Sequence, residues 1–165
     1  MLSEVNNADP SSSHTVNFRN VNRNDLEELP AKEQIETIVR GCIACVNNRD
    51  LDPKDCPALN YLAPGCLVDS TLDGQTSSQN LVPSFDRIEM FRKVTEEHPD
   101  FRIDIDAVDV QVDEELGKAV VHVYAKTSGM HDGVSIARFG VLEYGRFEGR
   151  WLSTRFMGAR GQILE

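Results

Sequence analysis

The sequence has no cluster of lysine and arginine residues and no long hydrophobic run. Its 165 residues hold 27 Asp and Glu against 17 Lys and Arg, a formal net charge of −10, so we expect no nucleic-acid partner. No segment approaches the roughly 18 apolar residues of a membrane span, and no basic segment followed by an apolar run suggests a secretory signal. We therefore expect a cytoplasmic protein without membrane contact. A chain of this length supports one hydrophobic core.

Cysteine is scarce, and all four residues, Cys42, Cys45, Cys56 and Cys66, fall in one stretch. The C-x-x-C pair raises a zinc or redox interpretation. A zinc site needs two further ligands, and no histidine lies close in sequence. A thioredoxin-type pair follows a strand, whereas this pair lies in a helical pattern. We predict reduced core cysteines and no metal, because cysteine also packs as a small apolar residue.

Residues 1–28 are rich in Asn, Ser and Asp and lack apolar periodicity, which predicts a mobile tail. Residues 29–165 are expected to form a single domain. Apolar residues at helical spacing predict a helix that begins at Pro30 and ends near Asn48. The expected path then runs through a short helix over 55–62, a break at 63–65 and a short strand over 66–72.

A third helix is predicted from Ser84, which could cap it, to His98-Pro99, which would end it. Beyond it the apolar period changes from helical to alternating. Strands are predicted over 101–112, 118–128, 134–146 and 150–157. The connections between them are short, so they should form an antiparallel meander. Helices followed by a meander indicate an α+β fold with the helices on one face of the sheet.

The end of the chain carries the most specific pattern. Val141-Leu142-Glu143-Tyr144, the turn Glu148-Gly149 and then Arg150-Trp151 resemble the SnoaL-like, or nuclear transport factor 2-like, superfamily. Met157 to Gly161 and His98 to Phe101 are similar to segments of many small fungal members. The resemblance covers about residues 29–160. It implies a cone-shaped barrel of a curved antiparallel sheet packed against about three N-terminal helices, and a homodimer.

The same resemblance implies an activity class. The superfamily includes isomerases, cyclases and dehydratases of secondary metabolism, which generally need no cofactor. The first hypothesis is therefore a cofactor-independent isomerase or cyclase that uses acid–base chemistry on a hydrophobic polycyclic, polyketide-type or terpenoid-type intermediate. The alternative is a noncatalytic protein of the same fold that binds a small molecule or dimerises. Fold alone does not choose between them.

A polar face can be predicted from the hairpin turns. If the Gly129–Gly133 connection is symmetric, Tyr124 lies opposite Arg138 and His122 opposite Gly140, and directly opposed residues share a face. A two-residue turn at Glu148-Gly149 would place Leu142 opposite Arg155 on that face. Alternating strands usually turn their apolar face toward the helices. The family resemblance implies instead that Arg138, Gly140 and Leu142 face the pocket and that the apolar Val/Phe face is a dimer surface.

The chemistry of these residues suits proton transfer. His122 is a natural acid–base near neutral pH, Tyr124 can donate a hydrogen bond, and Arg138 can hold an oxyanion. Gly140 would leave space for a substrate.

Further candidates carry alternatives. Arg40 could reach into the cone or extend along the helix edge, and Asp69 could be a polar pocket residue or a surface aspartate. Tyr61 could line the pocket mouth or pack in the core. Leu142 and Arg155 are candidate substrate contacts. Glu143 is a candidate base if the strand register differs by one residue.

Overall fold

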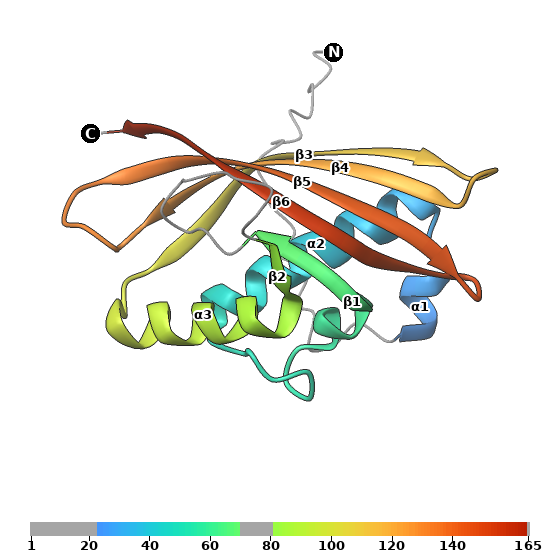
Figure 1. Cartoon of the computed structure of the whole chain (residues 1–165), viewed down its shortest axis with the longest axis horizontal. Helices are drawn as coiled ribbons and strands as arrows, with labels where there is room; N and C mark the ends of the chain where they lie inside the picture. Colours follow the sequence, from blue (N-terminus) through green and yellow to red (C-terminus); the bar gives the residue numbers. More distant parts are fainter. Residues whose placement is uncertain (1–22, 70–80, 165) are drawn as a thin grey trace, which may run out of the picture.

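The computed structural model describes residues 23–69 and 81–164, in which helices cover one face of a twisted six-stranded sheet (Figure 1). The strand order is β2-β1-β6-β5-β4-β3. The strands are β1 (Leu62–Asp69), β2 (Leu81–Pro83), β3 (Arg102–Asp113), β4 (Lys118–Ser128), β5 (Ser135–Phe147) and β6 (Arg150–Leu164). We call the face of the sheet toward the helices the concave face and the other face the outer face.

Four helical segments precede or interrupt the strands. They are α1 (Arg23–Glu27), α2 (Ala31–Asn48), the 3-10 helix η2 (Pro57–Tyr61) and α3 (Ser84–Glu97). Helix α2 runs beneath the long strands, and α3 lies beside it below the same layer (Figure 1). The space between these two helices and the concave face is where a pocket can form.

Side-chain hydrogen bonds connect the end of α2 to the start of β3. Arg49 adopts a left-handed conformation with φ 67°, which ends the helix. Its guanidinium donates to the carbonyl oxygens of Pro99 (2.6 Å) and Phe101 (2.9 Å). The Asn47 side chain donates to the Ile103 carbonyl (2.8 Å) and accepts from the Ile103 amide (2.9 Å). These bonds set the position of α2 against the sheet.

The main core lies between α2 and the concave face. Helical spacing places Ile35, Ile38 and Val39 on the buried side of α2. Val121 from β4 and Trp151 from β6 meet them from the sheet. A second cluster, centred on Phe101 with Val46 and Leu51, anchors α3 through Phe91.

The α+β class and the helix-covered sheet are confirmed, with two differences in architecture. The sheet is open and mixed, because β1 pairs with β6 in parallel, whereas the resemblance implied an antiparallel barrel. The predicted break at residues 63–65 is wrong, since these residues belong to β1. The β1–β6 register shifts between Leu62 and Leu67, and such an irregularity accommodates Pro64 and Gly65 in a strand.

Helix α1 lies within residues 1–28, the segment predicted to be a tail. Helix α1 contributes Leu26, which is buried in the main core. One buried residue in a five-residue helix produces no periodic signal, so the sequence pattern could not reveal it. Residues 1–22 of the predicted tail and residues 70–80 lie outside the described residues.

The cysteine prediction is wrong for two of the four residues. Cys45 on α2 and Cys56 just before η2 form a disulfide, with their Cα atoms 6.0 Å apart, an ordinary separation for such a bond. Cys42 and Cys66 are free thiols. Disulfides are uncommon in the cytoplasm, so this bond is unusual for the cytoplasmic protein that we expect.

Candidate functional site

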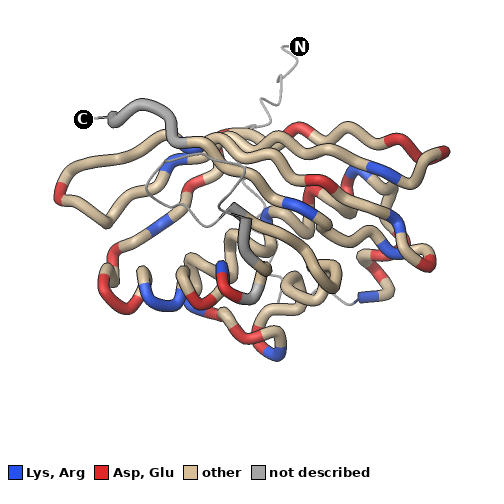
Figure 2. Tube along the Cα trace, in the orientation of Figure 1, with Lys and Arg blue, Asp and Glu red and all other residues tan. Residues whose placement is uncertain are grey.

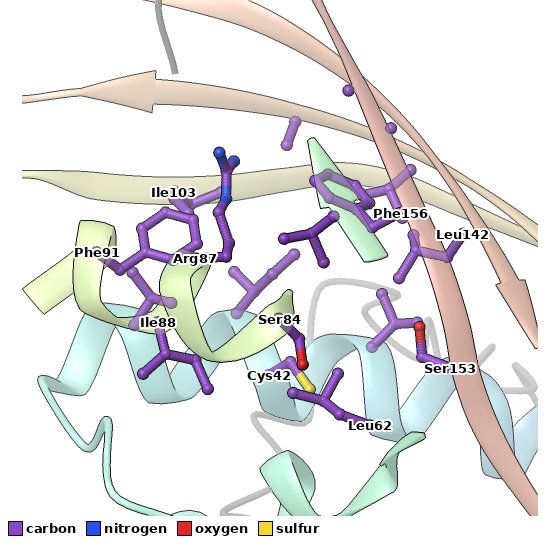
Figure 3. Close-up of a pocket in the computed structure, with 18 of the residues that line it drawn as sticks. Cys42, Leu62, Ser84, Arg87, Ile88, Phe91, Ile103, Leu142, Ser153 and Phe156 are labelled. Carbon is purple, nitrogen blue, oxygen red and sulfur yellow. The ribbon is translucent and has the colours of Figure 1, made fainter. Parts of the chain in front are cut away.

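A cavity of about 220 Å³ lies between α2, α3 and the concave face. This volume is below the roughly 300–1,000 Å³ of pockets for drug-sized ligands. Its walls are mainly apolar and include Ile38, Ile43, Ile88, Phe91, Ile103, Val123, Leu142 and Phe156. Figure 3 shows that labelled lining residues come from helix α3, such as Ile88 and Phe91, and from the strands, such as Leu142 and Phe156. Such a lining favours a hydrophobic small molecule.

Helix α3 brings an arginine into this apolar wall. Ser84, Arg87, Ile88 and Phe91 all line the cavity, because residues three, four and seven positions apart share one helix face. The Arg87 guanidinium carbon lies 4.8 Å from the ring centre of Phe91 and 5.8 Å from that of Phe156. Figure 3 shows the side chain rising from α3 toward the sheet. Cation–π contacts of this kind hold the guanidinium in place.

Strand β5 supplies a second arginine to the lining. Alternate residues of a strand share a face, and Arg138, Gly140, Leu142 and Tyr144 all contribute to the cavity. The Nε atom of Arg138 donates to the Thr127 hydroxyl at 3.1 Å. This bond orients the guanidinium on the concave face.

Residues that carry hydroxyl and thiol groups also line the cavity. Tyr61 and Tyr144 are both 3% exposed and belong to the lining with Cys42 and Ser153. Burial raises the pKa of Tyr144 well above its ordinary value, and burial also raises the pKa of Tyr61. Burial raises the pKa of Cys42 to about 12. All three groups therefore stay protonated at neutral pH and act as hydrogen-bond donors, and Cys42 is a poor nucleophile.

The predicted cluster of His122 and Tyr124 with Arg138 and Gly140 is wrong. In the β4–β5 pairing His122 lies opposite Val141 and Tyr124 opposite Phe139, while Gly140 lies opposite Val123. The true register differs by one residue from the symmetric turn that we assumed. A one-residue slip exchanges the two faces of a strand, so Val123 lines the cavity and His122 and Tyr124 lie on the outer face.

The last hairpin also departs from the prediction. Pairing follows a two-residue turn as far as Tyr144 and Ser153, but the register then shifts. Leu142 consequently lies opposite Phe156, and Glu143 lies opposite Arg155. Because Glu143 alternates with the cavity residue Leu142, it points to the outer face. Because of this β-bulge, Phe156 and not Arg155 lies opposite Leu142, and Phe156 lines the cavity.

The remaining predicted residues fall in three different environments. Arg40 lies on the solvent side of α2, 45% exposed, in an ion pair with Glu36 at 2.8 Å, so it extends along the helix edge. Tyr61 is both buried and part of the cavity lining. Asp69 is the last residue of β1, and its side chain lies outside the described part of the structure.

Two residues of the cavity lining, Arg87 and Tyr144, were not predicted from the sequence. Arg87 stands in the apolar stripe of α3, and an arginine at a core-facing spacing is a signal that helical periodicity could have revealed. Tyr144 shares its strand face with Arg138, Gly140 and Leu142, so extending the alternation by one step would have found it.

Within residues 23–69 and 81–164 no group of three or more His, Cys, Asp or Glu is placed to hold a metal ion. The helices of this same part of the chain are all too short or too polar to cross a membrane. Acidic and basic positions are interspersed along the trace (Figure 2).

No protein-family model matches the chain, and no curated protein matches it in sequence. Solved structures do match. An NTF2-like protein of unknown function from Pseudomonas putida has a TM-score of 0.58 and 13% identity, covering 78% of this chain and 85% of that one. An uncharacterized protein with a cystatin-like fold from Caulobacter vibrioides has a TM-score of 0.58 and 9% identity, covering 78% and 87%. A candidate ketosteroid isomerase from Shewanella frigidimarina has a TM-score of 0.55 and 10% identity, covering 74% and 92%.

The chain therefore has the nuclear transport factor 2-like fold, as the resemblance implied. Identities this low show the fold and not the reaction. The cavity lining of this chain holds two arginines and two buried tyrosines in a mainly apolar wall.

Proposed function

We propose that this protein is a cofactor-independent isomerase or cyclase acting on a hydrophobic intermediate of polyketide or terpenoid type. The observation that carries the proposal is the apolar cavity with hydrogen-bond donors set into its wall. A ring system fits the apolar part, and a carbonyl oxygen fits the donors. The rest of a polycyclic substrate would extend through the opening, because about 220 Å³ is too small for all of it.

The donors suit one half of an enolisation. As a proton leaves the carbon beside a carbonyl, negative charge develops on the carbonyl oxygen, and donors placed there stabilise it. Tyr61 and Tyr144 stay protonated because burial raises their pKa values. Arg87 and Arg138 stay cationic at all physiological pH values. These four side chains are our candidates for binding the developing enolate.

The other half of an enolisation needs a base that abstracts the proton. The cavity lining, as far as the structure describes it, contains no Asp, Glu or His. Asp69, the last residue of β1, remains our candidate base. The same composition favours the alternative function, a noncatalytic binding protein that only holds its ligand.

Deuterium exchange separates the two functions. 2-Tetralone is a compact hydrophobic ketone whose protons beside the carbonyl exchange with solvent through the enol. We expect the protein in D₂O to accelerate this exchange at least about 100-fold over buffer, followed by loss of the proton NMR signal. Tyr144→Phe, which removes one donor, should slow it by about 10-fold or more. Binding of 2-tetralone without faster exchange would support the noncatalytic alternative.

We also propose that a second copy of the chain covers the outer face of the sheet. Tyr124 is 49% exposed there, and its ring and that of His122 pack against Phe139 at 5.1 and 5.9 Å between ring centres. The same face carries both charge signs, with Asp109 3.8 Å from His122 and Lys126 in an ion pair with Asp106. A two-fold interface needs such a self-complementary surface.

Light scattering of the purified chain tests this dimer. We expect a dimer mass for the wild type and a monomer for Tyr124→Glu, because a carboxylate buried at the interface centre is costly. Lys54→Glu, an exposed charge change far from the outer face, should remain dimeric. A monomeric wild type at micromolar concentration would contradict the proposal.

A further inference from the structure

Two glycines leave part of the concave face without side chains. Gly140 on β5 lies directly opposite Gly158 on β6, and both residues line the cavity. Directly opposed residues share one face of a sheet, so the sheet presents only backbone to the cavity at these two positions. We call these two residues the glycine floor. Space for a substrate is what we expected of Gly140 from the sequence.

The Phe156 ring occupies the space above Gly140. A Cβ atom added at Gly140 would lie 2.7 Å from Cε2 and 3.3 Å from Cζ of Phe156, closer than the ordinary contact distance of about 3.5–4.0 Å between carbon atoms. These two atoms belong to the outer end of the ring, so the ring reaches from β6 across to β5. The space that the glycine leaves is therefore filled by a side chain of the protein itself.

The same ring also meets helix α3. The Arg87 guanidinium carbon lies 5.8 Å from the centre of the Phe156 ring and 4.8 Å from that of Phe91. Figure 3 shows the Phe156 ring beside β6, on the side of that strand where Arg87 lies. Phe156 thus stands between α3 and the glycine floor.

The other rings that face the cavity are held by closer packing. Tyr61 and Tyr144 are each 3% exposed, and Phe91 packs against the buried Phe101 with 6.4 Å between ring centres. Phe156 is only partly buried, and the backbone beneath the end of its ring has no side chain to interlock with it. A shorter side chain at position 156 would enlarge the cavity and keep the Phe91–Phe101 contact that anchors α3.

We propose that Phe156 determines the size of the ligand, restricting the cavity to compact hydrophobic molecules of one or two rings, and that the glycine floor is a covered subsite for one further flat ring. This inference rests on the proposed function, because it concerns the same cavity. An engineered apolar cavity of about 150 Å³ holds benzene, so about 220 Å³ suits a slightly larger ring system. Glycine allows a ligand to approach the backbone closely, so a flat ring fits the floor once Phe156 is shortened.

Two flat ketones that differ by one fused ring test the size limit. They are 2-acetylnaphthalene, with two rings, and 2-acetylphenanthrene, with three. A site without a size limit binds the larger ketone more tightly, because more apolar area is buried. We expect the wild type to bind 2-acetylphenanthrene at least about 10-fold more weakly than 2-acetylnaphthalene, since the third ring meets a filled space. Quenching of the single tryptophan, Trp151, measures binding at low ketone concentration.

Shortening Phe156 should remove this limit. In Phe156→Ala the third ring can lie on the glycine floor, so we expect 2-acetylphenanthrene to bind at least about 10-fold more tightly than it binds the wild type. The affinity for 2-acetylnaphthalene should change by no more than about 3-fold. Adding Gly140→Leu to this variant refills the floor and should restore the limit. If Phe156→Ala does not fold, Phe156→Leu is the milder variant and should shift the relative affinity in the same direction.

Phe147 on β5 provides a matched control. Its ring also covers a glycine, because a Cβ atom added at Gly145 would lie 2.8 Å from Cε2 of Phe147. Phe147 is 50% exposed and lies outside the cavity lining that the structure describes. Phe147→Ala therefore removes the same kind of ring from the same kind of position and should leave the relative affinity of the two ketones unchanged. Melting curves show whether each variant is folded.

The outcomes separate this inference from the function beneath it. A wild type that binds the larger ketone as tightly as the smaller one overturns the size limit and leaves the cavity as the ligand site. A folded variant at position 156 that keeps the wild-type preference, or an equal change in Phe147→Ala, also overturns the inference. If neither ketone binds the wild type or any variant at position 156, the proposed function fails together with the inference.

Discussion

Replacing Ser84 with tryptophan is expected to abolish binding of hydrophobic ligands while the protein stays folded. Ser84 is the first residue of α3 and lines the cavity, on the side where Cys42 and Leu62 also lie (Figure 3). Its side chain is only half-buried, so an indole can replace it with less strain than at a fully packed site. The indole would occupy space that the ligand needs. We expect at least roughly 100-fold weaker binding of 2-acetylnaphthalene in calorimetry.

Ser84→Ala is the matched control for this experiment. It removes the hydroxyl without filling the cavity, so binding should change by no more than about 3-fold. Melting curves of both variants monitor folding. Unchanged binding in folded Ser84→Trp would show that hydrophobic ligands bind elsewhere on the protein.

Substituting alanine for Gly129 is expected to destabilise the fold by about 3 kcal/mol or more. Gly129 follows β4 directly and has φ +82°, a conformation that side chains disfavour. A Cβ atom there would also overlap the backbone carbonyl of Asp100 and approach the amide of Phe101. Backbone atoms cannot move aside as a side chain can, and Phe101 is among the most buried residues of the chain. Guanidinium unfolding curves measure the effect.

Gly133 in the same connection provides the comparison. It also has a positive φ, +68°, but a Cβ atom there meets no atom within 4 Å. Gly133→Ala should therefore cost only the backbone term, about 1 kcal/mol. Equal losses in the two variants would mean that the close approach of Gly129 to the α3–β3 turn does not contribute to stability.

The periodicity of the sequence was sufficient to locate most of the long helices and strands. Helical spacing located α2 and α3, and alternation located β3, β4 and β5 to within about two residues, the usual precision of boundaries. The weaker predictions concerned short elements and the end of β6, which runs to Leu164 and not to residue 157. Helix α1 contributes a single residue to the core, and β1 contains a proline and a glycine that usually indicate a break.

The site could be predicted only in part, because it depends on strand register. Alternation on β5 correctly groups Arg138 with Gly140 and Leu142, since that grouping needs one strand alone. Placing His122 beside them needed the conformation of the Gly129–Gly133 connection, and an error of one residue moved it to the opposite face. The bulge near Glu143 had the same effect on Arg155. Short-range patterns do not encode these offsets.

The wall of the cavity depends on contacts between elements that are distant in sequence. Arg87 and Phe156 are 69 positions apart in sequence and meet only because α3 packs against β1, the strand next to β6 in the sheet. Likewise, Cys45 and Cys56 are brought together by the chain reversal between α2 and η2. Without a three-dimensional arrangement, each of these residues has an ordinary structural interpretation.

A crystal structure with 2-acetylnaphthalene bound tests the central claim most directly, namely that the cavity between α2, α3 and the concave face is the ligand site. The account predicts ligand density against Ile103 and Val123, with the ketone oxygen within hydrogen-bond distance of Tyr61, Tyr144 or one of the two arginines. Density on the outer face beside Tyr124, with the cavity filled by its own side chains, would contradict it.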